Sequence, residues 1–303
     1  MRQHTFSFMI HSDIAQLQDR LAQTGYIADR PLATALTLLL RLGKPLLLEG
    51  DAGVGKTAVA KALATLLECP LIRLQCYEGL DSSSAIYEWN YQHQLLTIKL
   101  QEQLKHSPEA QEAQIFSERF LLPRPLLKAI TQEQSPVLLI DEVDRADEEF
   151  EAYLLEVLSD FQISIPELGT IKATSIPYVI LTSNGTRELS DALRRRCLYH
   201  YLDYPNADKE LVIVQQHLPG IDHILALQVV SFVQALREMD LRKKPGIAET
   251  LDWAAALFSL NVTSLRDNPE AVISTLASLL KTREDWTKVD RDTVAILLGQ
   301  HRR

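Results

Sequence analysis

Eight consecutive residues near the start of the chain have the composition of a phosphate-binding loop. Residues 50–57 read Gly-Asp-Ala-Gly-Val-Gly-Lys-Thr, a complete match to the pattern G-x-x-x-x-G-K-[ST]. Glycines in such a loop allow positive φ angles, so that successive N–H groups can converge on phosphate oxygens. Lys56 is expected to reach the β- and γ-phosphates of a nucleotide, and the Thr57 hydroxyl to ligate Mg²⁺. The residues predicted to bind nucleotide are Gly50, Asp51, Ala52, Gly53, Val54, Gly55, Lys56, Thr57 and Ala58.

The segments on both sides of this loop supply the context that the motif requires. Residues 45–49 are a short apolar run suited to a buried strand, and residues 57–64 are good helix formers. A helix N-terminus after the loop adds partial positive charge for a phosphate. The alternative is an accidental glycine-rich turn, but with glycine at about 7% of residues a chance match has a probability of about one in a hundred. The pattern therefore predicts binding of a nucleoside triphosphate.

A second strand pattern ends in two carboxylates. Residues 137–140 are apolar, and Asp141 and Glu142 follow them. In phosphoryl-transfer sites an acid at such a strand end holds Mg²⁺, often through water, and this role falls to Asp141. A second acid can orient and polarise the attacking water, and this role falls to Glu142. A strand followed by Asp-Glu is common by itself, but together with the phosphate loop it indicates nucleotide hydrolysis.

Two further polar groups could take part. The strand predicted at 178–182 is followed by Ser183 and Asn184, whose amide could position water beside the γ-phosphate. The alternative is a Ser-Asn-Gly turn. Arg194, Arg195 and Arg196 close a short helix, where cations are ordinary helix-capping groups. One of them could instead enter the site of a neighbouring subunit and neutralise charge that develops on the γ-phosphate.

Composition limits the remaining classes of function. The 303 residues carry a net charge of −9, which argues mildly against broad nucleic-acid binding. The N-terminus lacks the apolar core of a signal peptide, and no run of 18 apolar residues predicts a membrane span. Cys69, Cys76 and Cys197 are scattered, which indicates reduced thiols in a cytoplasmic protein. The eight histidines show no metal-ligand spacing, so we expect no metal other than Mg²⁺.

The order of patterns along the chain predicts an α/β nucleotide-binding domain followed by a small helical domain. Helices are expected at 12–23, capped by Ser12 or Asp13, and at 30–41. Their alternation with apolar strands indicates a parallel sheet covered on both faces. The expected strands are 46–48, 71–74, 137–140, 178–182 and 198–202. Residues 88–116 are interpreted as a partly helical insertion and 161–174 as a β-hairpin; each is either loop decoration or a partner contact.

After residue 204 no strand pattern remains. Helices are expected near 207–217, 221–239, 247–260, 269–282 and 290–299, and Asn268-Pro269-Glu270 is a typical helix start. The predicted domains are 1–205, with the sheet, and 206–303, a helical lid.

These parts, in this order, resemble the AAA+ ATPases. The closest resemblance is to the MoxR branch, in the group typified by the ATPase that matures carbon monoxide dehydrogenase. It covers nearly the whole chain, and the Tyr-Glu-Gly-Leu-Asp run at 77–81 is fairly specific to that group. The segments that carry it are 74–81, which contains this run, 85–91, 141–146 and 241–253.

The resemblance implies a P-loop parallel sheet with a helical lid, and a hexameric ring whose ATP sites lie between subunits. By the same resemblance, Asn184 is the sensor, Arg196 is the first candidate for the finger from the adjacent subunit, and Arg195 is the second. Many relatives carry an arginine at the start of a lid helix, where this chain has Ala248. Lys243 or Lys244 is the candidate substitute, and a merely exposed lysine pair is the alternative.

The function expected from the resemblance is that of a chaperone-like ATPase. Its client would be a metalloenzyme awaiting its metal or cofactor, recruited through a von Willebrand factor A-domain protein supplied in trans. Three alternatives remain open at this point: a DNA-directed AAA+ machine, a monomeric kinase with a phosphate loop, and a GTPase. DNA-stimulated hydrolysis, the size of the protein with ATP, and turnover of ATP against GTP distinguish them.

Overall fold

The computed structural model describes residues 2–101 and 115–299, and the chain divides into two compact units. The sheet unit comprises Met1–Ile14, Arg30–Glu49 and Ala60–Tyr201. The helical unit comprises Ala15–Asp29, Gly50–Val59 and Leu202–Arg303. Each unit has its own hydrophobic core.

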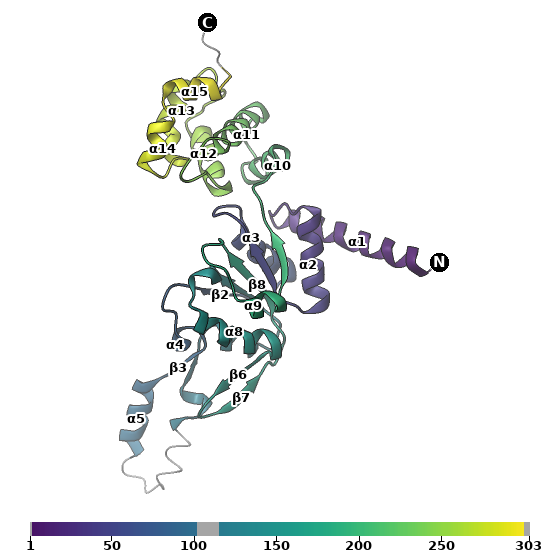
Figure 1. The fold of residues 1–303 in the computed structure, drawn as a ribbon, viewed down its shortest axis with the longest axis vertical. Coiled ribbons are helices and arrows are strands. Elements are labelled where there is room, and N and C mark those ends of the chain that lie inside the picture. The colour runs from purple at the N-terminus through teal and green to yellow at the C-terminus, as the bar shows by residue number, and fades with distance from the viewer. Residues whose placement is uncertain (1, 102–114, 300–303) are drawn as a thin grey trace. The chain divides into compact units, whose positions relative to one another are not determined.

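The sheet unit is built on a five-stranded parallel sheet (Figure 1). Its strands are β1 (Leu46–Glu49), β2 (Leu71–Gln75), β5 (Val137–Asp141), β8 (Tyr178–Ser183) and β9 (Leu198–Tyr201). The order across the sheet is β2-β5-β8-β1-β9, and all neighbouring pairs are parallel. The helices that connect or flank the strands are α2 (Arg30–Leu42), α3 (Lys56–Leu67), α7 (Pro125–Ile130), α8 (Glu148–Asp160) and α9 (Asp191–Arg196). All five strands predicted from the sequence are confirmed, each ending within one residue of its predicted end.

The central strands are apolar because both faces of the sheet are covered. All five residues of β5 are buried, as are the last five residues of β8. Helix α2 contacts β1, β8 and β9, while α7 contacts β2 and β5. A parallel sheet with helices on its faces requires such continuous apolar strands. In β5 the polar side chain, Asp141, stands at the carboxyl end of the strand, and the other predicted site residues of this unit, Glu142 and Asn184, directly follow β5 and β8.

Two segments between the strands of the main sheet form additional structure. The predicted hairpin is confirmed as β6 (Gln162–Ile165) paired antiparallel with β7 (Gly169–Lys172). The predicted insertion, 88–116, contains α5 (Tyr91–Gln101). Two short strands that the sequence did not indicate lie at its ends: β3 (Tyr87–Trp89) overlaps its start, and β4 (Leu121–Pro123) follows it. Strands β3 and β4 pair with each other but lie far apart in the sequence, so no local residue pattern predicts them. Residues 102–114 of the predicted insertion lie outside the described residues.

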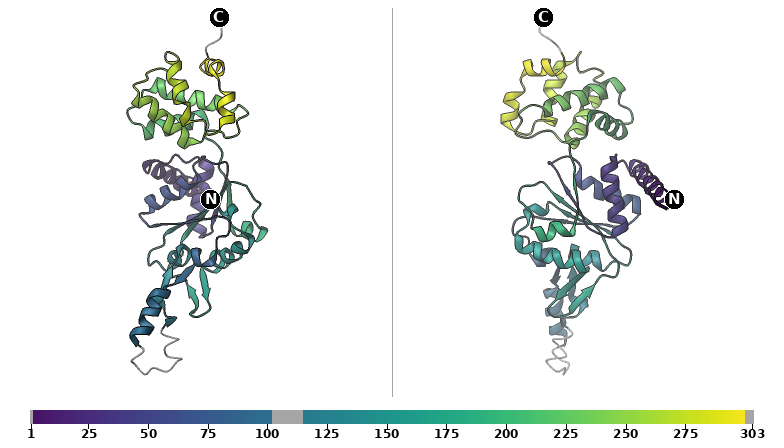
Figure 2. Two further views of the ribbon diagram at one scale, coloured as in Figure 1. Left: turned by 90° about the vertical axis from the view of Figure 1, so that its left-hand side faces the viewer. Right: turned by 45° about the vertical axis from the view of Figure 1, so that its right-hand side comes forward.

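The C-terminal part of the helical unit is a bundle of short helices around a buried core (Figure 2). They are α10 (Ala207–His217), α11 (His223–Arg237), α12 (Ile247–Ser259), α13 (Pro269–Thr275), α14 (Arg283–Lys288) and α15 (Arg291–Leu297). Asn268 caps α13 as predicted, by accepting a hydrogen bond from the N–H of Ala271. The helix predicted to run to 282 ends as an α-helix at Thr275, and α14 was not predicted. Thr282 starts α14 by accepting from the N–H of Asp285.

The first helix is longer than predicted. Helix α1 spans Arg2–Gln23, so positions 12 and 13 lie within it, and the prediction that one of them caps it is wrong. The Asp13 carboxylate instead forms an ion pair with Arg41 of α2. In the described part of the chain, no helix combines the length and the apolar character needed to cross a membrane.

Candidate nucleotide-binding site

The phosphate loop has the predicted strand–loop–helix context. It follows β1 directly, and α3 begins at Lys56. Gly53 and Gly55 have φ angles of +84° and +98°, which L-residues with side chains rarely adopt. Gly50 is required for a second reason, because a Cβ atom there would collide with the carbonyl oxygen of Leu202. The glycines therefore serve both backbone conformation and close packing.

Lys56 is folded over the loop that precedes it. Its side chain is buried, and its ammonium donates hydrogen bonds to the carbonyl oxygens of Gly50 at 2.7 Å and Asp51 at 2.8 Å. A buried charge needs such partners to offset the loss of hydration. The ammonium is thus held at the loop, where anionic phosphate oxygens would be stronger partners than neutral carbonyls.

The tip of the loop contacts the start of α12. The N–H of Ile247 donates to the carbonyl oxygen of Gly53 at 2.9 Å. A Cβ atom at Gly246 would lie 2.6 Å from the Cα of Gly53, and one at Gly53 would lie 2.9 Å from the Cα of Gly246. Only two glycines can approach this closely. The hydroxyl of Tyr204 also donates to the carbonyl oxygen of Ala52, at 3.4 Å.

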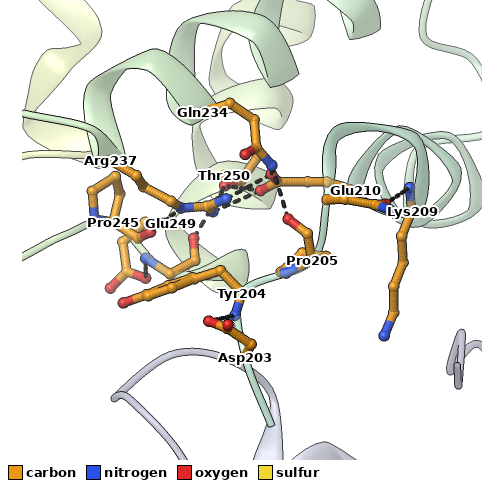
Figure 3. A network of polar contacts seen from close by, with 12 residues as sticks. Asp203, Tyr204, Pro205, Lys209, Glu210, Gln234, Arg237, Pro245, Glu249 and Thr250 are labelled. Carbon is orange, nitrogen blue, oxygen red and sulfur yellow. Dashed lines mark hydrogen bonds and ion pairs between the residues drawn. The ribbon is translucent and has the colours of Figure 1, made fainter. Parts of the chain in front are cut away.

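A buried ion pair underlies this contact (Figure 3). The Arg237 guanidinium donates to both carboxylate oxygens of Glu210 at 2.7 Å and to the carbonyl oxygen of Pro245 at 2.8 Å. It also donates to the Thr250 hydroxyl at 3.1 Å and lies 4.8 Å from the centre of the Tyr204 ring. All three guanidinium nitrogens of Arg237 donate hydrogen bonds, and two of these bonds form a bidentate pair with Glu210. Such a pair fixes the geometry of its neighbours, which here include Tyr204 and Pro245.

Asp141 ends β5 in a fully polar surrounding. Its side chain is only 3% exposed. The Thr182 hydroxyl of β8 donates to Oδ1 at 2.5 Å, and the Arg73 guanidinium of β2 donates to Oδ2 at 2.6 and 3.0 Å. These partners come from the two strands that flank β5. They offset the loss of hydration and orient the carboxylate at the carboxyl edge of the sheet.

Glu142 lies at the same edge in a left-handed backbone conformation, with φ +55° and ψ +49°. Its N–H donates to the Thr182 hydroxyl at 2.9 Å. Its carboxylate accepts from the Gln75 amide at 3.1 Å and pairs with Arg145 at 3.1 Å. A non-glycine residue in this conformation is uncommon, and such residues cluster at functional sites.

Asn184 follows β8, and its backbone is anchored by Asp144. The Oδ2 atom of Asp144 accepts from the N–H groups of Asn184 at 3.2 Å and Thr186 at 2.9 Å, and from the Thr186 hydroxyl at 2.6 Å. Burial would raise the pKa of Asp144, but these hydrogen bonds outweigh it and hold the pKa below the ordinary value. Asp144 thus joins the segment after β5 to the segment after β8.

The three arginines of α9 have different surroundings. Arg194 pairs with Glu49 at 3.7 Å and with Glu188 at 3.4 Å. Arg195 is exposed and pairs only weakly with Asp191, at 4.0 Å. Arg196 donates to the Ser159 hydroxyl and to the carbonyl oxygen of Ala192. The role of a finger, predicted first for Arg196 and then for Arg195, stays a prediction.

The thiol nearest the two acids is kept neutral. Burial, followed by the charges of Asp141, Asp144 and Glu142, raises the pKa of Cys76 to about 12. Burial also raises the pKa of Cys197 to about 12, against a small opposite effect of Arg196. Neither thiol is therefore a nucleophile at neutral pH.

Within the sheet unit, the fold brings Asp141, Glu142 and the backbone of Asn184 to one edge, while the roles predicted for them stay predictions. It also adds residues that the motifs did not single out, which connect these three or hold the two acids: Thr182, Asp144, Arg73 and Gln75. Asp144 lies two residues after Glu142 in the run Asp-Glu-Val-Asp. No local signal marked its role, because the groups that it binds follow another strand.

One family profile matches half of the chain, and two curated proteins resemble most of it. The profile described as "AAA domain (dynein-related subfamily)" matches residues 45–197. An uncharacterized protein of Staphylococcus aureus (strain USA300) is 31% identical over 73% of this chain and 78% of its own length. One from Staphylococcus haemolyticus is 29% identical over 74% of this chain and 79% of its own.

A solved structure shares the fold. A mutant form of RuvB from Thermotoga maritima aligns with a TM-score of 0.51 at 17% identity, over 88% of this chain and 73% of that one. At this identity the likeness concerns the fold alone. The matched family profile covers the phosphate loop, β5 with Asp141, and β8 with the following Asn184, and the chain belongs to the dynein-related subfamily of AAA domains.

Proposed function

We propose that this protein binds and hydrolyses ATP and uses the cycle to remodel a partner protein. The observation that carries the proposal is a complete phosphate loop between β1 and α3, in a chain of the AAA family with two acids at the end of β5. Nucleotide binding is assigned to Gly50–Ala58, and Lys56 would exchange its carbonyl partners for the β- and γ-phosphate oxygens of the substrate.

Thr57 and Asp141 are proposed as oxygen ligands of Mg²⁺. The Thr57 hydroxyl and the Asp141 carboxylate are hard oxygen donors of the kind that Mg²⁺ prefers, and Asp141 is held in place by Arg73 and Thr182. When bound, the ion would neutralise phosphate charge in the transition state. Asp141 would hold the ion directly or through an intervening water.

Glu142 is proposed as the group that takes the proton from the attacking water. Its carboxylate is held by Gln75 and Arg145, one from the neighbouring strand and one from the turn that follows. These partners orient the carboxylate, and its oxygens remain acceptors for a water proton. Asn184 would position that water, with its backbone fixed through Asp144.

The wider role rests on the resemblance stated from the sequence. We propose a MoxR-type chaperone in the cytoplasm, assembled as a hexamer in which Arg196 or Arg195 completes the neighbouring site. A von Willebrand factor A-domain protein would deliver the client, a metalloenzyme that awaits its metal or cofactor. The boundary between the nucleotide domain and the lid is proposed after residue 205.

Phosphate release by the purified protein tests the enzymatic proposal. With Mg²⁺ we expect turnover of ATP in preference to GTP, no stimulation by single- or double-stranded DNA, and a larger assembly on light scattering when ATP is present. Preference for GTP, or stimulation by DNA of several-fold or more, would favour the rival functions. A monomer that transfers phosphate to a small molecule would contradict the proposal.

A further inference from the structure

A hollow of about 380 Å³ lies in the sheet unit, between the segment that follows β2 and the turn that follows β5. It is lined by residues 77–78, residues 144–147 and Arg187. The N–H of Gly79 donates to Oδ2 of Asp147 at 3.3 Å and joins the two sides. The volume falls in the range of about 300–1,000 Å³ that is usual for ligand sites. The run 77–81, which stands out in the sequence, has no role in the proposed ATPase and contributes to this hollow.

The buried carboxylate of Asp144 lines the hollow and has one oxygen without a partner. Its Oδ2 accepts three hydrogen bonds from the segment after β8, whereas Oδ1 is buried and accepts none from the residues that the structure describes. Against the effect of burial, the three bonds hold the pKa of Asp144 below its ordinary value, so the carboxylate is ionised at neutral pH. A buried anionic oxygen without a donor is destabilising, and a ligand that donates to it would remove this cost.

The hollow has an excess of negative charge. Its two arginines pair with acids outside it, Glu142 at 3.1 Å and Glu151 at 2.6 Å. Glu78 and Asp147, the rim acids, are exposed, and neither forms an ion pair with another residue in the described ranges. A cation that enters the hollow would therefore meet carboxylates that no basic side chain already neutralises.

The hollow also has a donor that lacks an acceptor. Nε of Arg187 is buried and has no hydrogen-bond partner in the described part of the chain, although the other two nitrogens of this guanidinium donate to Glu151 and to two backbone carbonyl oxygens. The exposed Tyr77 adds an aromatic ring, on which a planar guanidinium can stack. A peptide supplies carbonyl acceptors together with a cationic side chain, whereas a small free cation supplies no acceptor.

We propose that this hollow binds an arginine side chain of a partner protein. Arginine fits better than lysine, because its five donors can reach several carboxylates at once. The guanidinium would donate to Oδ1 of Asp144 and to the rim acids, and a carbonyl oxygen of the partner would accept from Arg187. Because Oδ1 is covered in the free protein, the exposed side chains around it would move aside. The proposal goes beyond the proposed ATPase and rests on it only in taking a protein as the partner.

Saturation-transfer NMR on the full-length protein, without nucleotide, tests this contact. The probe is an acetylated and amidated pentapeptide, Gly-Ser-Arg-Ser-Gly. Its control is the same peptide with citrulline in place of arginine, which has nearly the same shape but no charge. We expect the arginine peptide to bind at least about tenfold more tightly than the citrulline peptide.

Two variants and a matched control locate the contact. Asp144→Asn keeps one oxygen for the bonds to the segment after β8 and replaces the other by an NH₂ group, so most of the preference for arginine should disappear. The rim variant, Glu78→Gln/Asp147→Asn, should bind the arginine peptide about fivefold more weakly. The control Glu148→Gln/Glu149→Gln removes two exposed acids of α8 that do not line the hollow, and its affinity should stay within about twofold.

Equal binding of the two peptides by the unaltered protein, or no binding of the arginine peptide, would overturn the inference. A loss in the control variant as large as that in the rim variant would also overturn it, because it would indicate a general attraction to an acidic surface. Unchanged binding in the rim variant, or in an Asp144→Asn protein with an unaltered melting temperature, would contradict the contact. Absence of ATP turnover would contradict the proposed function and leave the peptide result standing, so the two failures are distinguishable.

Discussion

Lys56→Ala is expected to lower the affinity for both ATP and ADP by about 100-fold, the largest effect on binding that any single side chain here should have. The ammonium now bonds two loop carbonyls, and these are weaker partners than the phosphate oxygens that would replace them. Its removal deletes a charge-assisted contact to both nucleotides, so the loss should not discriminate between them. Calorimetric titration with each nucleotide measures it.

A neighbouring lysine provides the control for this variant. Lys61 lies on the same helix, α3, and is exposed, so Lys61→Ala removes the same charge away from the loop. Its affinities should match those of the unaltered protein. If Lys56→Ala bound ATP as tightly as Lys61→Ala, residues 50–57 would not be the phosphate-binding segment.

Glu142→Gln should reduce ATP turnover by about 10²–10⁴-fold and leave ATP affinity within about twofold. The amide keeps the shape of the side chain and can still accept from Gln75 and Arg145, but it cannot take a proton from water. Rates of phosphate release under saturating ATP, together with calorimetric affinity, separate the two effects.

The control for charge at this end of the sheet unit is Glu149→Gln, an exposed acid in the first turn of α8. It should retain full turnover. Turnover of Glu142→Gln near that of the control would exclude Glu142 as the base. A parallel loss of ATP affinity would instead mean that Glu142 acts through the structure of the binding site.

The strands of the sheet could be predicted from the sequence because each buried parallel strand is a short, continuous run of apolar residues. Residues 137–140 contain no polar side chain, and two acids follow where the strand reaches its carboxyl end. The phosphate loop was equally local, since its eight residues and the elements on either side are contiguous. The order of the strands across the sheet was not predicted, because no residue pattern specifies which strand lies between β1 and β5.

The groups that orient the site could not be predicted, because they are defined by contacts between distant segments. Thr182 bonds both Asp141 and the N–H of Glu142, yet its own strand reads as an ordinary apolar run. Arg237 and Glu210 pair across two helices, and neither position departs from the pattern of a solvated helix. Charge burial of this kind becomes visible only when the packing is known.

The start of α1 shows that a local sequence signal can also mislead. Ser12 and Asp13 have the side chains of a helix cap, and the apolar periodicity begins just after them. The helix nevertheless begins at Arg2, and Asp13 serves as a partner for Arg41. A side chain that can cap a helix therefore indicates where a helix can begin, and does not by itself show that it begins there.

The claim that two copies of the chain build each catalytic site is tested most directly by mixing inactive variants. If the claim holds, Lys56→Ala lacks the phosphate-binding half of each site, and Arg195→Ala/Arg196→Ala lacks the half that a neighbour would donate. Each alone should release phosphate at least about 10³-fold more slowly than the unaltered protein. Mixed rings should recover a readily measured fraction of the rate of the unaltered protein. At some of their interfaces, the intact loop of the arginine variant meets the intact arginines of Lys56→Ala. Full turnover by the arginine variant alone, or no recovery in rings shown by fluorescence transfer to have mixed, would contradict the claim.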